Sequence, residues 1–176
     1  SSVTGVQTCA LPISCSTRIR EALAAGDVEH AAEHLGRPFC FRGAVTHGDR
    51  RGRELGFPTA NLPVPANLAS PADGVYAGFL TRRDGLDGRG ERLAADAPAP
   101  RWPAAISVGT NPTFGGLSRR VESYVLDRDD LELYDAPVTV EFVARTRGQV
   151  KFDGLERLIR QMRTDVADCR RLLGLG

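Results

Sequence analysis

The chain has 176 residues, enough for one domain with a substantial core, and its net charge of +1 gives no general reason to expect a nucleic acid or an anionic membrane as partner. Only 6% of the residues are aromatic, against 19 glycines and 11 prolines, which favours a turn-rich β architecture over a helical bundle. No apolar run approaches the roughly 18 residues of a membrane span. The four cysteines form no CxxC pair and are too scattered for a zinc site or a disulfide framework, so we expect a reduced, cytoplasmic setting.

The beginning of the chain divides into two parts. Residues 1–14 carry no helical or strand period that continues beyond Ser14 and no secretory signal pattern, and we expect them to be non-native or disordered. A helical hairpin is predicted after them. Ser16 can cap a first helix that ends at Gly26, and Asp27 can cap a second helix that ends at Gly36.

The second of these helices contains the pattern H-x-x-E-H between His30 and His34, which resembles the inverted zinc-peptidase signature. Two histidines four residues apart do share one face of a helix. However, the segment is short and rich in alanine, and no downstream carboxylate marks a third ligand. We therefore interpret these residues as solvent-facing polar side chains.

After Pro38 the apolar period falls to two, which predicts strands. The first begins at Phe39, and the others are predicted at residues 74–81, 104–108, 121–126 and 138–145. Residues 84–103 are long for a hairpin connection and are predicted to form a mobile surface loop. Short strands without interleaved helices argue for an antiparallel barrel or sandwich.

The clearest helical pattern closes the chain. Apolar residues recur at the spacing of one helical face, namely Leu155, Leu158, Ile159, Met162, Val166, Cys169 and Leu173. Asp153 and Glu156 resemble a capping box at its start. We expect this apolar face to cover one side of the barrel.

The stretch GRELGFPTAN, residues 52–61, combines backbone freedom, a cation and hard oxygens. Its two glycines let a polyanion approach the main chain closely, and Arg53 supplies positive charge. Thr59 and Asn61 would leave an extended segment on the same face, which suits a Mg²⁺ ion held partly by phosphates. No Walker A motif occurs. The alternative is a plain Gly/Pro turn between two strands.

Four further residues each have an ordinary structural explanation when considered one at a time. Asn111 ends a strand pattern and would lie beside whatever the glycine-rich stretch binds. Glu122 fits a surface position on an edge strand, yet a lone carboxylate at a barrel mouth can also accept a proton from a hydroxyl nucleophile. Arg147 and Phe152 come after the last strand and would offer a cation and a stacking ring to a planar ligand.

Taken together, five segments resemble, in order and spacing, the riboflavin kinase domain of bacterial bifunctional riboflavin kinase/FMN adenylyltransferases. They are GRELGFPTANL, ADGVYAGF, AAISVGTNPTF, VESYVLD and TRGQVKFDGLERLIRQMRTD, and the match spans about residues 37–173. The resemblance implies a mainly β fold, a six-stranded antiparallel Greek-key barrel with a C-terminal helix. It also implies transfer of the ATP γ-phosphate to the 5′-hydroxyl of riboflavin, giving FMN and ADP.

The same resemblance implies roles for individual residues. Glu122 corresponds to the catalytic base, and Thr59 and Asn61 to the residues that meet Mg²⁺ and the nucleotide phosphates. Arg147 and Phe152 fall in the region that lines the flavin pocket. The closing flap and the other nucleotide contacts are implied for Gly48, Arg53, Gly56, Asn111, Val125, Asp127 and Tyr134.

Residues 16–20, STRIR, resemble the motif that closes the adenylyltransferase module of the same family. The HxGH signature of that module is not present in this sequence, so we expect no FMN adenylylation from this chain. Residues 1–14 then suggest an artificial junction at which a longer protein was cut or misassembled. We expect residues 1–14 to be non-native, 15–36 to be a helical remnant of that module, and 37–176 to be the kinase domain.

The chain departs from the family pattern at two places, and two alternative functions stay open. Asp135 stands where the family usually has glycine after Leu-Tyr, and Gln149-Val150 replaces the more polar residues common before Lys-Phe; both departures bear on flavin affinity and local turn geometry. A non-catalytic flavin-binding module would need no metal site, which argues against it. A nucleic-acid-binding barrel would fit the arginine clusters but not the near-neutral charge. The expected partners are therefore riboflavin or FMN and ATP or ADP, with no nucleic acid, no membrane and an open oligomeric state.

Overall fold

The computed structural model describes residues 16–47, 56–113 and 116–175, and the side chains between 111 and 117 are not part of that description. The prediction for residues 1–14 therefore lies outside the described residues. The same is true of two predicted flap residues, Gly48 and Arg53.

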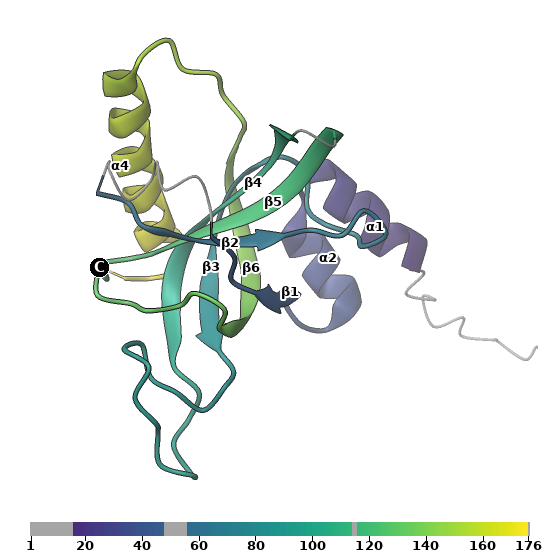
Figure 1. Cartoon of the computed structure of the whole chain (residues 1–176). Helices are drawn as coiled ribbons and strands as arrows, with labels where there is room; N and C mark the ends of the chain where they lie inside the picture. Colours follow the sequence, from purple (N-terminus) through teal and green to yellow (C-terminus); the bar gives the residue numbers. More distant parts are fainter. Residues whose placement is uncertain (1–15, 48–55, 114–115, 176) are drawn as a thin grey trace, which may run out of the picture.

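A six-stranded antiparallel sheet forms the body of the molecule (Figure 1). Its strands are β1 (Phe39–Ala44), β2 (Thr59–Pro63), β3 (Gly74–Arg82), β4 (Arg101–Thr113), β5 (Gly116–Val125) and β6 (Pro137–Gly148). Their order in space is β1-β6-β3-β4-β5-β2. Because β6 returns to lie beside β3, next to the consecutive strands β3, β4 and β5, the connection is a Greek key.

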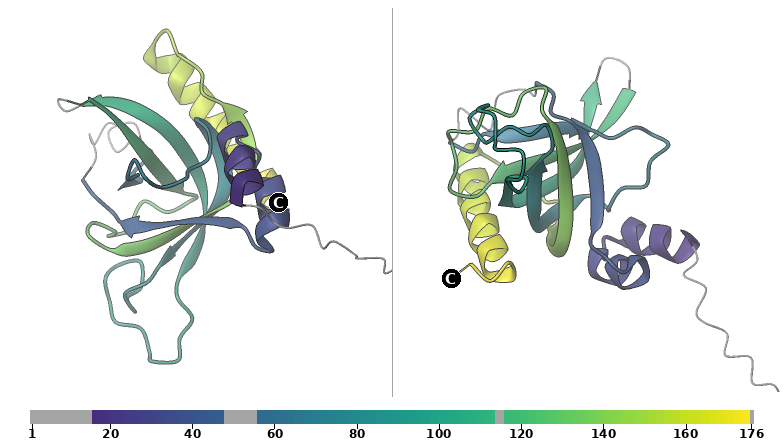
Figure 2. Two further views of the ribbon diagram at one scale, coloured as in Figure 1. Left: turned by 90° about the vertical axis from the view of Figure 1, so that its right-hand side faces the viewer. Right: turned by 90° about the horizontal axis from the view of Figure 1, so that it is seen from below.

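The two edge strands of this sheet meet at one point. Thr46, just beyond β1, forms a bridge with Asn61 of β2, and its N–H donates to the Asn61 carbonyl oxygen over 2.8 Å. The sheet thus curls into a partly closed barrel, which Figure 2 shows from two sides. The predicted six-stranded antiparallel Greek-key fold is confirmed.

The barrel interior is filled by side chains that alternate along the strands. In the first strand, Phe41 and Val45 are buried, whereas Arg42 and Ala44 between them are exposed, as the period of two predicted. The largest fully buried side chains of the strands include Tyr76, Phe142, Leu62, Leu80 and Ile106. Each such side chain contributes about 1.5–3 kcal/mol when it leaves water.

The predicted helical hairpin is present as α1 (Ser16–Ala25) and α2 (Val28–Leu35). Asp27 caps α2 by accepting a hydrogen bond of 2.9 Å from the His30 N–H, and Gly36 ends it at a φ of 68°. Ser16 is the first described residue of α1, and its predicted role as the cap of that helix stays a prediction.

The hairpin packs on the barrel. Leu23 and Val28 are 1% and 0% exposed and belong to the same apolar cluster as the barrel interior. Figure 2 shows that the hairpin and α4 (Leu155–Leu172) lie on opposite sides of the sheet. Among the described residues, no helix is both long and apolar enough to cross a membrane.

The helix α4 starts differently from the prediction. Gly154 is its N-cap, and no side chain makes a cap hydrogen bond. The φ of Gly154, 116°, is available to few residues other than glycine, and this glycine displaces Asp153 from the cap position of the predicted capping box. Further along the helix, Cys169 is buried against Ala77, whereas Leu155 is 57% exposed. Only the C-terminal part of the apolar face therefore covers the sheet.

Several strand assignments differ from the sequence pattern. The strand β5 begins at Gly116, before the predicted 121, and β6 continues to Gly148, so Arg147 lies within the last strand and not after it. The strand β4 begins at Arg101, so residues 101–103 belong to it and not to the predicted loop. The remaining loop extends from the barrel at the bottom of Figure 1 and contains one short bridge, between Leu86 and Arg92. Its mobility stays a prediction. The strand β2 was implied by the family resemblance but was not among the strands predicted from periodicity.

Candidate functional site

Three neighbouring strands place a row of polar residues on one face of the sheet. Glu122 of β5 lies directly opposite Asn61 of β2 on one side and Ser107 of β4 on the other. Directly opposed residues in adjacent antiparallel strands project their side chains from the same face. Their neighbours in β5, Val121 and Ser123, are buried on the other face. We call Ser107, Glu122 and Asn61 the polar row.

The polar row lies on the face of the sheet that α4 partly covers. Tyr124 and Ala105 lie two residues from Glu122 and Ser107 in the same strands and therefore on the same face, and both pack in the apolar cluster formed with α4. The barrel interior lies on the opposite face. The row is therefore an outward-facing site next to a helix, and its three strands β4, β5 and β2 are neighbours in the sheet.

The side chains of Thr59 and Asn61 lie together, as predicted for one face of an extended segment. The Asn61 Nδ2 donates to the Thr59 Oγ1 over 3.3 Å and to the Thr59 carbonyl over 3.2 Å. Asn61 is only 8% exposed. This packing holds two hard oxygen-bearing groups in one place beside Glu122.

An aromatic pair anchors the start of β2. Tyr124 lies opposite Thr59, and its ring meets Phe57 edge to face, with 5.2 Å between the ring centroids. Burial, together with the charges of Asp127 and Asp129, raises the pKa of the Tyr124 phenol, so the ring stays neutral. Neither ring was predicted from the sequence to belong to the site. The aromatic residue immediately before Pro-Thr-Ala-Asn was the available signal.

The segment after β6 is fastened beside the polar row. The Gln149 Nε2 donates to the Val108 carbonyl over 3.1 Å and lies 3.5 Å from the Ser107 Oγ. Gly109 leaves room for it, because a Cβ there would lie 3.1 Å from the same nitrogen. The residue that departs from the family pattern is thus the one that attaches the β6–α4 connection to β4.

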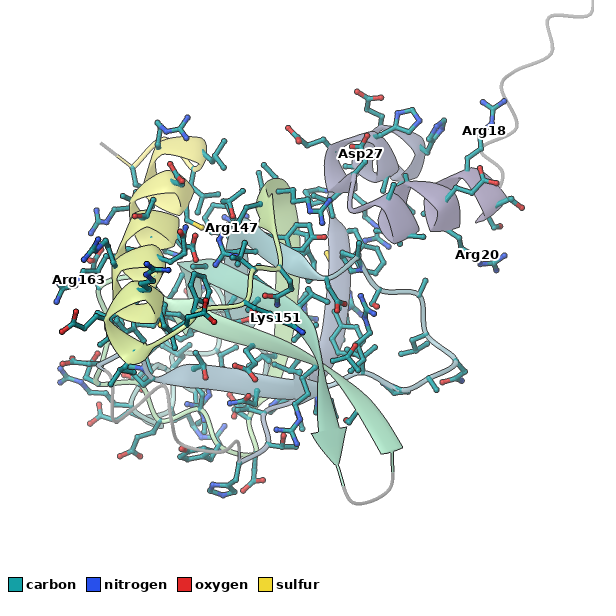
Figure 3. The ribbon with its side chains drawn as sticks, turned by 90° about the horizontal axis from the view of Figure 1, so that it is seen from above. Arg18, Arg20, Asp27, Arg147, Lys151 and Arg163 are labelled. Atoms are coloured by element: carbon teal, nitrogen blue, oxygen red, sulfur yellow. The ribbon has the colours of Figure 1, made fainter. Side chains whose placement is uncertain are left out.

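Arg147 and Phe152 are brought together, but the charge of Arg147 is already paired. Its Nε and Nη2 donate to the two carboxylate oxygens of Asp165 in α4, over 2.7 and 2.6 Å. Asp165 is 6% exposed and also accepts from the Gln161 side chain. The Phe152 ring centre lies 5.8 Å from the guanidinium, and Figure 3 shows Arg147 between the sheet and α4. Arg147 therefore ties β6 to α4.

The residues predicted to contact the nucleotide differ in their surroundings. Val125 is 3% exposed in the barrel interior, so its side chain is not available to a ligand at this face and only its main chain is. Asp127 has a φ of 58° and is ion-paired with Arg170 of α4. Tyr134 is 43% exposed and stacks on His47, with ring centroids 4.1 Å apart.

The structure describes the remaining predicted residues to different extents. Gly56 has a φ of 82°, a left-handed conformation that favours glycine, so this glycine meets a backbone requirement. Asn111 lies in β4 opposite Ser118, but its side chain is outside the description. Gly48 and Arg53 lie outside the described residues.

The H-x-x-E-H residues of α2 contact one another on an exposed surface. The His30 Nδ1 lies 3.2 Å from the Glu33 carboxylate, and the His30 Nε2 lies 3.2 Å from the His34 Nε2. Within the described ranges, no group of three or more His, Cys, Asp and Glu side chains could hold a metal ion.

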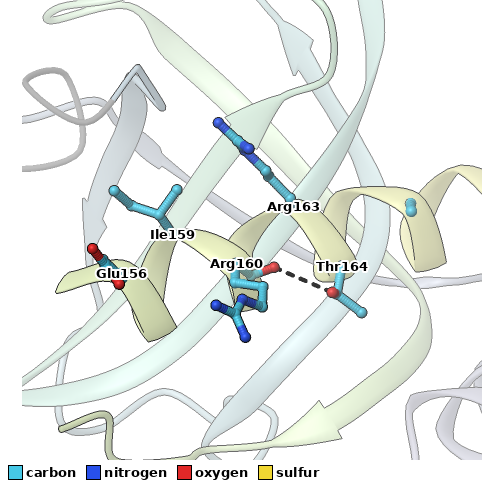
Figure 4. Close-up of a pocket in the computed structure, with 6 residues that line it drawn as sticks. Glu156, Ile159, Arg160, Arg163 and Thr164 are labelled. Carbon is cyan, nitrogen blue, oxygen red and sulfur yellow. Dashed lines mark hydrogen bonds between the residues drawn. The ribbon is translucent and has the colours of Figure 1, made fainter. Parts of the chain in front are cut away.

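An open hollow of about 590 Å³ runs along α4 (Figure 4). Its described lining consists of Glu156, Ile159, Arg160, Arg163, Thr164 and Ala167. At 3.6 residues per turn, these residues lie mainly on the side of the helix away from Cys169. The Thr164 hydroxyl bonds back to the Arg160 carbonyl, within the helix. The hollow is therefore separate from the polar row.

The chain is similar to proteins of known family. A family profile described as "Flavokinase: Riboflavin kinase" matches residues 35–173. The bifunctional riboflavin kinase/FMN adenylyltransferase of Escherichia coli (strain K12) is 34% identical over 160 residues, and that of Listeria monocytogenes serovar 1/2a is 36% identical over 165. These matches cover 91% and 93% of this chain but 46% and 48% of the relatives, so the chain spans about half their length.

Two solved structures resemble the chain in three dimensions. One, from Streptococcus pneumoniae and described as a macrolide-efflux protein, has a TM-score of 0.73 at 35% identity and covers 89% of this chain and 46% of its own. The other, riboflavin kinase from Trypanosoma brucei, has a TM-score of 0.54 at 26% identity and covers 78% of this chain and 80% of its own. The second match extends over most of both chains.

Proposed function

The chain belongs to the riboflavin kinase family, and from that premise we propose that it transfers the γ-phosphate of ATP to the 5′-hydroxyl of riboflavin, giving FMN and ADP. One observation carries the proposal beyond the family match. The register of β4, β5 and β2 brings Ser107, Glu122 and Asn61 side by side, with Thr59 against Asn61. A proton acceptor thus lies beside oxygen groups that suit a metal–phosphate complex.

In the proposed reaction, the ribityl oxygen forms a bond to the γ-phosphorus while the bond from that phosphorus to the ADP oxygen breaks. The proton of the hydroxyl passes to the Glu122 carboxylate. Ser107 and Asn61, on either side of Glu122, limit where the hydroxyl can approach. Phosphoryl transfer depends mainly on positioning and charge stabilisation, and these groups are of the types that such a reaction requires.

Thr59 and Asn61 would hold Mg²⁺ together with the nucleotide phosphates. They fit the ion because both offer neutral, hard oxygens within one packed pair, and Mg²⁺ commonly uses one or two protein oxygens with phosphates and water. When bound, the ion would neutralise negative charge on the phosphates. ATP enters as a co-substrate, and Asp127, Tyr134 and the main chain at Val125 are the proposed nucleotide contacts among the described residues.

The flavin is proposed to lie against Phe152, on the connection that Gln149 fastens to β4. Arg147 then contributes by holding β6 and α4 together, since its guanidinium is engaged by Asp165. This proposed role differs from the expectation from sequence, in which Arg147 offers a free cation to the flavin ring.

The proposal is tested by incubating the purified chain with riboflavin, ATP and MgCl₂ and quantifying FMN by chromatography. We expect FMN formation that stops when EDTA removes the metal. The Glu122→Gln variant should lose at least about 100-fold in kcat because the proton acceptor is gone, while its Kd for Mg-ATP stays near that of the wild type. Glu29→Gln, an exposed change on α2, serves as the matched control.

Other outcomes would support other functions. Near-normal turnover by Glu122→Gln would remove the base role. Flavin binding by the wild type without FMN formation would support a non-catalytic flavin-binding module. Affinity for oligonucleotides that falls steeply with salt would support the nucleic-acid-binding alternative.

A further inference from the structure

A buried arginine joins two loops at the C-terminal end of β3. Arg82, the last residue of β3, is only 5% exposed. Its Nε and Nη2 donate to the two carboxylate oxygens of Asp84 over 2.8 and 3.0 Å, and its Nη1 donates to the carbonyls of Asp87 and Glu132 over 2.8 and 2.9 Å. Burying a charge is costly unless it is paired and hydrogen-bonded, and these four bonds meet that condition.

The two loops are the β3–β4 loop, residues 83–100, and the β5–β6 loop, residues 126–136. Besides those of Arg82, two hydrogen bonds join them. The Glu132 N–H donates to the Gly88 carbonyl over 2.8 Å, and the Arg89 Nε donates to the Asp130 carboxylate over 3.1 Å. The β3–β4 loop therefore holds the β5–β6 loop from outside the barrel.

The β5–β6 loop in turn holds the chain next to Asn61. The Asp135 N–H donates to the Val45 carbonyl over 2.9 Å, and the Val45 N–H donates to the Ala136 carbonyl over 3.0 Å. The next residue, Thr46, forms the bridge to Asn61. Val45 and Thr46 therefore connect the end of the β5–β6 loop to the polar row.

The same loop also places a ring pair. Tyr134, near the end of the β5–β6 loop, stacks on His47, whose neighbour Thr46 is bonded to the Asn61 carbonyl. A displacement of the loop would move both the exposed ring and the segment paired with Asn61.

We propose that Arg82 is a positioning residue for the nucleotide. Through the Glu132 carbonyl it sets the place of the β5–β6 loop, and that loop sets the place of Tyr134 and of residues 45–47 beside Thr59 and Asn61. The proposal rests on the proposed kinase function. It also gives the β3–β4 loop a role, namely to supply the groups that make the buried Arg82 stable.

The test compares Arg82→Met, which removes the donors, with Arg82→Lys, which keeps the charge but not the fork of donors. Arg83→Met is the matched control, because Arg83 is the next residue and its side chain is exposed. Steady-state rates are measured well below the melting temperature of each variant. We expect the KM for ATP to rise about tenfold in Arg82→Met and less in Arg82→Lys, with the KM for riboflavin within about twofold of the wild type. Arg83→Met should match the wild type.

A merely structural role would give a different result. A lower melting temperature with both KM values unchanged, or an equal rise in both, would overturn the proposal. If Arg82→Met does not fold, Asp84→Asn weakens the same network from its more exposed side and should raise the KM for ATP in the same direction. If the wild type forms no FMN, the kinase proposal fails by itself, and calorimetric Kd values for Mg-ATP make the same comparison between variants.

Discussion

Asp135 occupies a turn position at which the family resemblance implies a glycine. Its φ of 60° lies in the left-handed region, and its N–H donates to the Val45 carbonyl over 2.9 Å. Aspartate enters this region more readily than most residues. The replacement therefore keeps the turn before β6, and the question that the sequence raised about turn geometry is answered.

Cys169 is predicted to make stability depend on pH in alkaline solution. It is 0% exposed between α4 and the sheet, and its thiol donates to the Tyr76 carbonyl over 3.6 Å. Burial first, and then the charges of Asp165 and Asp168, raise the pKa of the Cys169 thiol from 9.0 to about 12. Because the pKa is higher in the folded state, the contribution is complete below pH 9 and is lost as pH rises to about 12. Urea titrations across this range should show a falling free energy of unfolding.

The variant Cys169→Ala isolates this effect, since the phenols of Tyr76 and Tyr124 also have raised pKa values and ionise at high pH. We expect the variant to be less stable at pH 8 but to lose less stability between pH 9 and 12. The same slope in both proteins would contradict a buried, protonated thiol.

At the scale of elements, the apolar period of two predicted the strands in which buried and more exposed side chains alternate. Val138, Val140, Phe142 and Ala144 are all buried in β6, as their spacing indicated. The strand β2 was harder to recognise, because Pro58 and the preceding glycines also fit a turn. Its pairing with β5 on one side and its bridge to Thr46 on the other make it a strand.

Some site predictions at this scale were within reach of the sequence and others were not. The inward orientation of Val125 arises from the same period of two that turns Glu122 outward, so it was predictable. The engagement of Arg147 by Asp165 was not, because the two residues lie on different elements and only the packing of α4 brings them together.

The Arg147–Asp165 pair is predicted to attach α4 to the sheet. Removing one partner leaves the other charge buried, so Arg147→Met should lower the free energy of unfolding by about 3 kcal/mol in urea titrations. The control is Arg171→Met, which breaks an exposed pair with Asp168 inside α4 and should cost less than about 1 kcal/mol. Unchanged stability with a raised KM for riboflavin would assign the Arg147 cation to the flavin.

At the scale of the whole molecule, the helical hairpin and the barrel form one packed unit. Arg145 of β6 donates to the Ala25 carbonyl over 3.1 Å and to the Asp73 carbonyl over 2.9 Å, and the Ala72 N–H donates to the Leu23 carbonyl over 2.8 Å. The predicted boundary between a remnant at 15–36 and a kinase domain at 37–176 stays a prediction. The shared core makes the hairpin mechanically part of the barrel.

Hydrogen exchange tests this attachment. We expect the Leu23 and Ala31 amides to exchange slowly in the wild type and about tenfold faster or more in Arg145→Met, because hydrogen bonds from a charged group are lost. Amides of Leu80 and Val140 in the barrel should change much less. Hairpin amides that exchange freely in the wild type, or a uniform increase throughout the barrel, would contradict the attachment.

The sequence by itself determined the alternation of the strands, the cap of α2 and the order of the family motifs, because these depend on residues close together in the chain. Only the tertiary structure decided that Ser107, Glu122 and Asn61 stand in register, that Asp165 takes the charge of Arg147 and that Arg82 joins two loops. The physical reason is that strand register and buried ion pairs connect residues far apart in the chain, and packing of the whole barrel selects them.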